Sequence, residues 1–399
     1  MKLEDVLKDY PHLELRKCWE LRLPTALALG ECVGLIDSLG DFPLTPQVHD
    51  NLHQVALSRG AQATTAIEGN TLTDDEVRLI LEKKELPPSR QYQVQELQNA
   101  IDAMNEVGGT VFRADGEGKR LLVTPELICS FHKLIGKNLG EVFDAVPGKF
   151  RTDRRHVGRY LAPPHEVVPE LVKRLCDWLR DAFTFSKGAQ AIDEAIQQAI
   201  AAHVYFEWIH PFGDGNGRTG RLLEFFILLR AGFPDICAHV LANHYNNTRQ
   251  EYTYHFDKAK SKRNISEFLD YSITGLRDGL KEVMQQVQEG IFRVAWRSYV
   301  YDKFSEYKDY RKKTVFTRRR DLALAMPLNE SFHLGRLIAS DLDLYKQFEV
   351  LGKRAAKDDM DVIVKLGLAE STGIDSFRAT TEALQAMKSL SVQRASSRG

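Results

Sequence analysis

Apolar residues spaced one helical turn apart dominate the chain, and clear start signals divide it into segments. Such spacing runs from Ile192 to Val204 and predicts a buried helix there. Thr73–Glu76 has the order of a capping box, and Thr124–Pro125 places a hydroxyl before a proline, as at many helix starts. The pattern therefore predicts a mainly α fold.

One segment departs from the helical pattern. Between Gly148 and Pro164, the stretches Phe150–Thr152 and His156–Tyr160 have the character of two short strands that end at a pair of prolines. A β-hairpin is expected here, and helical spacing resumes from Val168.

The composition is ordinary for a globular chain. The 399 residues are 43% hydrophobic and carry 54 basic against 55 acidic side chains, so charge indicates no particular partner. We expect a cytoplasmic protein, because there is no secretion pattern and no apolar run of roughly 18 residues that would span a membrane. The cysteines form no CxxC pair and are odd in number, which favours neither a disulfide framework nor a zinc site.

The densest chemistry lies in residues 210–221, His-Pro-Phe-Gly-Asp-Gly-Asn-Gly-Arg-Thr-Gly-Arg. This stretch falls between the helix that ends at Ile209 and a second apolar helix, Leu222–Leu229. It combines a base, a carboxylate, a glycine-rich turn and two guanidiniums. Those are the parts of a phosphoryl-transfer site.

The glycines and arginines suit phosphate binding. Gly215 and Gly217 flank Asn216, so the backbone N–H groups there can approach a phosphate closely at the start of the next helix. Arg218 and Arg221 lie on the same side of its first turn, and both are expected to reach phosphate oxygens.

The remaining two groups suit metal binding and proton transfer. Asp214 is placed to hold Mg²⁺, which takes only one or two protein carboxylates. His210 has a near-neutral side chain that can accept a proton from an attacking hydroxyl. Each residue alone would be read as part of a turn or a solvated face; their uninterrupted order favours a functional site.

The stretch resembles the Fic family signature HPFx(D/E)GNGRxxR without a departure. The resemblance implies an all-α core that transfers AMP from ATP to a hydroxyl of a target protein, with His210 as base and Asp214 on Mg²⁺. It implies that Arg218 and Arg221 bind the β/γ end of the nucleotide. The phosphate-binding set expected from the motif is Gly215, Asn216, Gly217, Arg218, Thr219, Gly220 and Arg221. A glycine at 217 distinguishes the chain from the phosphorylating Doc-like branch, which tends to carry lysine there.

A second stretch, Thr64–Asn70, resembles the inhibitory helix of the same family, (S/T)xxxE(G/N). By itself it would be a helix end with Gly69 as cap. In company with the motif it implies autoinhibition: Glu68 is expected to pair with Arg221 and occupy the fork that the γ-phosphate needs.

The hairpin corresponds to the family's flap, which pairs with an extended target segment. Its expected contact residues are Val157, Gly158, Arg159 and Tyr160. Arg151, Arg154, Arg155 and Arg159 make it basic, which suits an acidic target, with a solvated hairpin as the alternative. Tyr252 and Thr253 fall where relatives contact the adenine.

The resemblance divides the chain into four parts. These are an N-terminal helical region 1–110 with the inhibitory helix near 64–69, a Fic core 111–290, a linker 291–310 and a winged-helix-like domain 311–395. The expected fold is thus mainly α, a Fic-type helical core with a β-hairpin flap plus the small C-terminal domain.

The C-terminal domain is expected to have a helix at Arg319–Ala323, another at Ala355–Leu366 and a wing hairpin at Gly367–Phe377. The basic cluster Arg311–Arg320 would suit DNA phosphates. The acidic side chains of the second helix, Asp358, Asp359 and Asp361, would repel a duplex, so a protein contact is favoured over DNA.

The leading interpretation is an autoinhibited, Mg²⁺-dependent protein adenylyltransferase that uses ATP and acts on Ser, Thr or Tyr hydroxyls of a target protein and of itself. The alternatives are a DNA-binding regulator with a nucleotide-sensing Fic core and an enzyme that removes AMP. A homodimer is an expectation from relatives; no membrane partner is expected.

Overall fold

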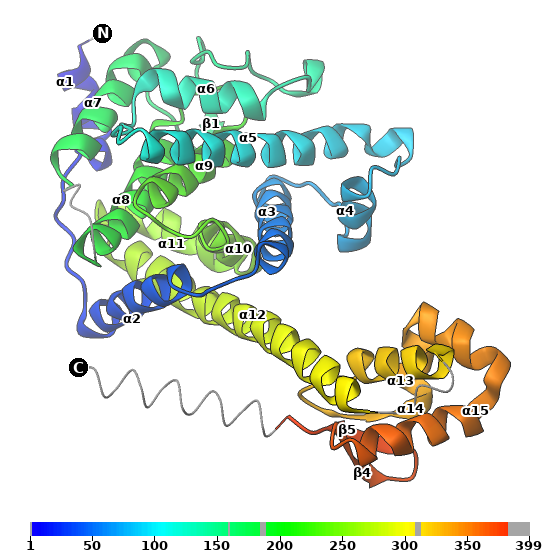
Figure 1. Ribbon diagram of the computed structural model, residues 1–399. Helices are drawn as coiled ribbons and strands as arrows, with labels where there is room; N and C mark the ends of the chain where they lie inside the picture. The colour runs from blue at the N-terminus through cyan, green and yellow to red at the C-terminus, as the bar shows by residue number, and fades with distance from the viewer. Residues whose placement is uncertain (1, 159, 184–188, 308–312, 382–399) are drawn as a thin grey trace. The chain divides into compact units, whose positions relative to one another are not determined.

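The computed structural model describes residues 2–158, 160–183, 189–307 and 313–381 (Figure 1). It divides into two compact units, Met1–Gln285 and Gln286–Gly399. Each unit is described by itself.

The first unit is built from helices. Their bounds are α1 Leu3–Asp9, α2 Leu23–Gly40, α3 Pro46–Ile67, α4 Asp74–Leu81, α5 Gln91–Gly116, α6 Pro125–Ile135, α7 Val168–Asp181, α8 Ala189–Ile209, α9 Asn216–Arg230, α10 Val240–Asn247, α11 Arg249–Lys262 and the start of α12, Ser266–Glu306. Short 3₁₀ turns lie at Pro11–Leu13, Pro88–Arg90, Gly140–Val142 and His165–Val167.

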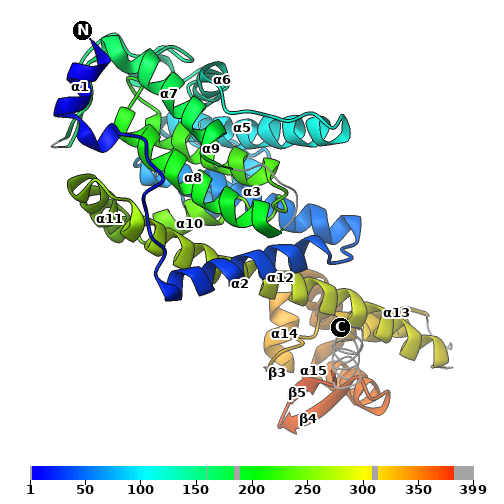
Figure 2. The same cartoon turned by 90° about the vertical axis from the view of Figure 1, so that its left-hand side faces the viewer.

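The pair α8 and α9 forms the centre of this unit: α5 and α6 pack on α9, α7 packs on α8, and α3 packs against both α5 and α10 (Figures 1 and 2). Ile196, Ile200 and Val204 of α8 are fully buried, which confirms the helix predicted from their spacing. Nearly every residue of α9 is buried as well. The loop between two such rigid helices is therefore held firmly at both ends.

The predicted helix starts are confirmed. The Thr73 hydroxyl accepts from the Glu76 N–H, and the Glu76 carboxylate accepts from the Thr73 N–H at 2.8 Å, so a complete capping box opens α4. The Thr124 hydroxyl accepts from the Leu127 N–H at 3.2 Å and opens α6.

The hairpin lies within residues 156–161, so the prediction of a single strand at His156–Tyr160 is wrong, because the chain reverses between Val157 and Tyr160. Strands β1 (His156–Val157) and β2 (Tyr160–Leu161) pair antiparallel, with Val157 opposite Tyr160. The expected strand Phe150–Thr152 is wrong, because the Arg151 N–H donates to the Pro211 carbonyl at 3.0 Å and ties that segment to the motif loop instead. Arg159 lies outside the described residues.

Among the described helices, α2 is long and apolar enough to cross a membrane by length and composition alone. The sequence analysis expected no such run, and this is a correction. In the structure, Ala28, Leu29, Cys32 and Ile36 of α2 are buried, and the helix packs on α8.

The prediction of a linker at 291–310 is also wrong. Through Glu306 these residues continue α12 as helix. The physical reason is packing: Trp296, Val300 and Phe304 are almost completely buried in the core of the second unit, so this stretch belongs to a folded domain.

The second unit has the element order expected of a winged helix. It continues with α13 Lys313–Ala325, β3 Ser331–His333, α14 Leu334–Ser340, α15 Leu342–Lys365, β4 Ala369–Gly373 and β5 Ser376–Ala379. The strands form an antiparallel sheet in the order β3-β5-β4, and the β4–β5 hairpin falls where the wing was predicted. Gly352, at φ 79°, interrupts α15, so its second half corresponds to the predicted helix before the wing.

The basic cluster and the acidic helix of this unit bind each other. Asp359, whose side chain is 1% exposed, accepts from Arg318 Nε at 2.6 Å and from Arg319 Nε at 2.7 Å. The expectation that Asp359 would repel a duplex is therefore corrected, because its charge is buried and neutralised. The two arginines are held within the domain by the same contacts.

Candidate active site

The motif loop is closed by its own asparagine. His210, at φ 50°, follows the end of α8, and Gly215, at φ 76°, leads into α9. The Asn216 side chain accepts from the Phe212 N–H and donates to the Phe212 carbonyl, each at 2.9 Å. The amide thus holds the loop, Asn216 also lines the cavity beside it, and its expected contact with phosphate stays a prediction. Its backbone N–H remains among the N-terminal groups of α9 that have no intrahelical partner.

A histidine from α6 supports the loop from below. His132 Nδ1 accepts from the Gly148 N–H at 2.9 Å, so its Nε2 carries the proton that is donated to the Asp214 carbonyl at 2.9 Å. Its ring stacks on Phe212, with centroids 3.7 Å apart. Burial lowers the pKa of His132 to about 4, which keeps this ring neutral. The sequence analysis missed His132, because nothing in its own helix distinguishes it.

A cavity of about 980 Å³ opens beside the loop. It brings together four segments that are far apart in the sequence. Of the predicted residues, its lining includes Glu68, Val157, Gly158, Tyr160, His210, Asp214, Gly215, Asn216, Gly217, Arg221, Tyr252 and Thr253. Of the residues not predicted, it includes Glu207, Phe256, Asp257 and Lys260.

His210 is held as a neutral base at this cavity. Its carbonyl accepts from Arg151 Nε at 2.8 Å, and its ring nitrogen Nδ1 lies 3.8 Å from Glu207 Oε2. Burial, followed by the nearby charge of Arg151, lowers the pKa of His210 to about 4. At neutral pH this imidazole is therefore uncharged, which is the form that a general base needs.

Glu207 is a buried carboxyl that the sequence analysis missed. Its Oε1 has no hydrogen-bond partner among the described residues. Burial, and then the neighbouring charge of Glu68, raises the pKa of Glu207 to about 8. A Cβ on Gly220 would lie 2.9 Å from this oxygen. Gly220 therefore makes room between α8 and α9 and does not line the cavity, which corrects its expected phosphate contact.

The predicted ion pair between Glu68 and Arg221 is present. Arg221 Nη2 lies 2.6 Å from Glu68 Oε1, and the same guanidinium donates to the hydroxyl and the carbonyl of Thr64 at 2.8 and 2.9 Å. Burial acts to raise the pKa of Glu68, but the charge of Arg221 lowers it overall. A Cβ on residue 217 would lie 2.0 Å from Glu68 Oε1, so Gly217 allows the carboxylate to approach.

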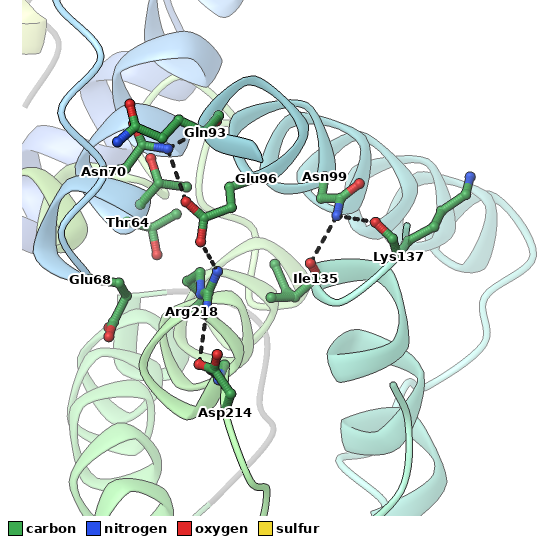
Figure 3. Close-up of polar contacts among 12 residues, drawn as sticks. Thr64, Glu68, Asn70, Gln93, Glu96, Asn99, Ile135, Lys137, Asp214 and Arg218 are labelled. Atoms are coloured by element: carbon green, nitrogen blue, oxygen red, sulfur yellow. Dashed lines mark hydrogen bonds and ion pairs between the residues drawn. The ribbon is translucent and has the colours of Figure 1, made fainter. Parts of the chain in front are cut away.

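Arg218 is absent from the lining of this cavity and lies between Glu96 and Asp214 (Figure 3). Its guanidinium pairs with Glu96 of α5 and, at 3.0 Å, with Asp214. The side chain is 4% exposed and is held by these two carboxylates, so its expected contact with nucleotide phosphates stays a prediction. Thr219 is likewise fully buried and lies outside the cavity lining.

Asp214 is the carboxylate that fits a magnesium ion. Its side chain is 34% exposed at the cavity, and its Oδ1 accepts from the Gly215 N–H at 2.5 Å and from Arg218. The described residues contain no group of three His, Cys, Asp or Glu side chains that could hold a metal. Asp214 would therefore share the ion with phosphate oxygens and water, which is the coordination that Mg²⁺ favours.

Comparison with known proteins agrees with this geometry. Residues 122–228 match the model of the Fic/DOC family. Over these residues the chain is similar to the Fic/DOC family. The match runs from the segment before α6 into α9 and so includes the whole motif loop.

Two named relatives show how far the likeness extends. Protein adenylyltransferase fic-1 of Caenorhabditis elegans is 34% identical over 195 residues, which are 47% of this chain and 34% of that protein. Protein adenylyltransferase Fic of Drosophila willistoni is 30% identical over 212 residues, which are 52% of this chain and 38% of that protein. The chain thus spans little more than a third of these relatives.

Solved structures support the fold. A Fic family protein from Desulfovibrio desulfuricans G20 superposes with a TM-score of 0.56 at 20% identity, over 92% of this chain and 98% of that one. Fic-1 from C. elegans superposes with a TM-score of 0.54 at 23% identity, over 66% of this chain and 73% of that one.

The β1–β2 hairpin, called the flap below after the segment it resembles, is held in place by hydrogen bonds and ion pairs. Tyr160 donates to the Trp208 carbonyl at 2.7 Å. Arg151 is buried and donates to the carbonyls of Asp153 at 2.6 Å and Pro163 at 2.5 Å, as well as to that of His210. Arg155 pairs with Asp144 and Asp153. The expected basic surface is corrected for Arg151 and Arg155, whose charges are committed within the fold.

The α11 side of the cavity carries Tyr252 and Thr253. The Tyr252 hydroxyl lies 3.0 Å from His203 Nε2, and its ring centroid is 4.9 Å from that of Tyr245. The Thr253 hydroxyl donates to the Arg249 carbonyl at 3.0 Å. Tyr252 and Phe256 give this side of the cavity an aromatic surface, to which a flat base could bind, and the expected adenine contacts of Tyr252 and Thr253 stay predictions.

Proposed function

We propose that this chain is a protein adenylyltransferase, which transfers AMP from ATP to a Ser, Thr or Tyr hydroxyl of a target protein and of itself. The observation that carries the proposal is that a neutral His210, the N-terminus of α9 and Asp214 face one cavity. The named activity of the relatives supports the same reaction.

In the proposed reaction, His210 accepts the proton of the acceptor hydroxyl as its oxygen bonds to the α-phosphorus. The bond between the α-phosphorus and the bridging oxygen breaks, and pyrophosphate leaves with that electron pair. The N–H groups of Asn216 and Gly217, at the N-terminus of α9, stabilise the charge on the phosphoryl oxygens. Mg²⁺ held by Asp214 would neutralise charge on the phosphates.

The proposed enzyme is autoinhibited in the arrangement described above. Glu68 and Thr64 together accept hydrogen bonds from Nε and Nη2 of Arg221, which is 3% exposed. A γ-phosphate that needs this guanidinium would meet the Glu68 carboxylate in its place, and two anions would then compete for one cation.

Incubation of the purified chain with labelled ATP and MgCl₂ tests the proposal. Glu68→Gly should raise label transfer to the chain itself at least tenfold, because Arg221 is released. Adding His210→Ala should lower that rate by about 10² to 10⁴, the usual contribution of a general base.

Glu85→Gly, at an exposed loop position, is the matched control and should leave the rate unchanged. Equal rates in the intact chain and in Glu68→Gly would reject the autoinhibition. Label transfer that survives His210→Ala unchanged would reject the proposed base.

A further inference from the structure

A chain of polar contacts leads from the inhibitory turn to the carboxylate of the motif (Figure 3). Asn70 Nδ2 donates to Glu96 Oε2 at 3.1 Å and to the Gln93 carbonyl at 2.9 Å. The other oxygen of Glu96 accepts from Arg218 Nη1, and Arg218 Nη2 donates to Asp214 Oδ1 at 3.0 Å. Glu96 thus connects the turn after α3, which carries Glu68, with the start of α9, which carries Arg218.

The turn that carries Asn70 also carries Glu68. The Gly69 N–H donates to the Ala66 carbonyl at 2.9 Å and the Asn70 N–H to the Thr65 carbonyl at 3.1 Å, the two bonds of a Schellman cap at the end of α3. Within this single turn, Glu68 reaches Arg221 and Asn70 reaches Glu96. The same turn therefore holds both arginines at the start of α9: Arg221 directly through Glu68, and Arg218 indirectly through Asn70 and Glu96.

Because both side chains are buried, the ion pair with Glu96 fixes the position of the Arg218 guanidinium. The side chains are 9% and 4% exposed, so little water is at hand to replace a lost partner. Arg218 does not line the cavity, and it reaches the site only through Asp214. With Glu96 in place, Arg218 is fixed at one end and orients the Asp214 carboxylate with the other.

We propose that Glu96 is a positioning residue, which orients the metal-holding carboxylate of Asp214 through Arg218. This inference rests on the proposed nucleotide site. Its expected consequence is on metal dependence, because partners behind a metal ligand typically contribute 10- to 100-fold to metal affinity.

Calorimetric titration of ATP at a series of MgCl₂ concentrations tests this role. The background is Glu68→Gly with His210→Ala, which frees Arg221 and prevents turnover. Glu96→Gln keeps the shape of the side chain and removes its charge. It should raise the MgCl₂ concentration for half-maximal ATP affinity about tenfold, and leave ATP binding in excess chelator unchanged.

Glu106→Gln is the matched control, because Glu106 lies on the same helix with its side chain 61% exposed, and it should leave the metal midpoint unchanged. Should Glu96→Gln fail to fold by circular dichroism, Glu96→Asp retains the charge and shortens the side chain, and it should shift the midpoint in the same direction.

An unchanged metal midpoint in a folded Glu96 variant would overturn the inference and leave the proposed function standing. Absence of any ATP binding in the background protein would instead reject the proposed nucleotide site itself. The two failures are therefore distinguishable.

Discussion

Arg218 and Arg221 show how two residues of one type acquire different tasks. Both belong to the first turns of α9 and both are almost fully buried. Arg221 faces the cavity and Glu68, whereas Arg218 faces Glu96 and Asp214. The two side chains are chemically identical, and the acidic residues on the neighbouring segments determine which partner each one binds.

Asn216 provides a test of the loop itself. Asn216→Ala removes two hydrogen bonds and leaves the buried N–H and carbonyl of Phe212 without them. Since each unsatisfied buried group costs roughly 1–3 kcal/mol, we expect the free energy of unfolding to fall by about 3 kcal/mol. Urea unfolding measures this change, and Asn247→Ala at an exposed site is the control. Equal losses in both variants would contradict the role of Asn216.

At the scale of elements, the flap depends on one buried cation. Arg151 joins the carbonyls of His210, Asp153 and Pro163, so the base and both ends of the flap share a single planar guanidinium. A lysine ammonium has no planar fork to span three such carbonyls.

We therefore expect Arg151→Lys, in the Glu68→Gly background, to lower the label-transfer rate about tenfold, because His210 loses its orientation. Cleavage of the flap by chymotrypsin should accelerate in the same variant. Arg154→Lys, at an exposed neighbouring position, should change neither measurement. A flap that resists cleavage as before would show that Arg151 does not fasten it.

At the scale of the molecule, opposing buried groups set the pH of greatest stability. Burial lowers the pKa values of His203, His210 and His239 from 6.5 to about 3, 4 and 4. The unfolded chain then binds more protons below pH 6.5, and stability is lost as the pH falls. Burial raises the pKa values of Glu207 and Glu224 from 4.5 to about 8, so stability is lost as the pH rises towards 8.

We expect the first unit to be most stable near pH 6.5 and to lose about 2 kcal/mol by pH 8. Urea unfolding followed by tryptophan fluorescence measures this in a Trp296→Phe variant, whose remaining tryptophans all lie in that unit. Glu224→Gln should flatten the alkaline side. Stability that increases from pH 6.5 to pH 8 would contradict the assignment of both carboxyls as protonated.

Much of the fold followed from local pattern. The α8 helix, the capped starts of α4 and α6, and a hairpin near Gly367–Phe377 were predicted correctly, because spacing, caps and turns act between neighbours in the chain. The predictions of a strand at 150–152 and a linker at 291–310 were wrong. The first segment bonds to the Pro211 carbonyl and the second packs in the core of the second unit, and both contacts join residues far apart in the sequence.

The sequence by itself determined the motif loop between two buried helices and the meeting of Glu68 with Arg221, since both stand in recognisable short motifs. Tertiary structure alone decided the roles of Glu96, His132 and Arg218. Glu96 lies 122 positions from Arg218, and His132 lies 82 from Asp214. No spacing rule connects such pairs; burial in a shared low-dielectric interior made them partners.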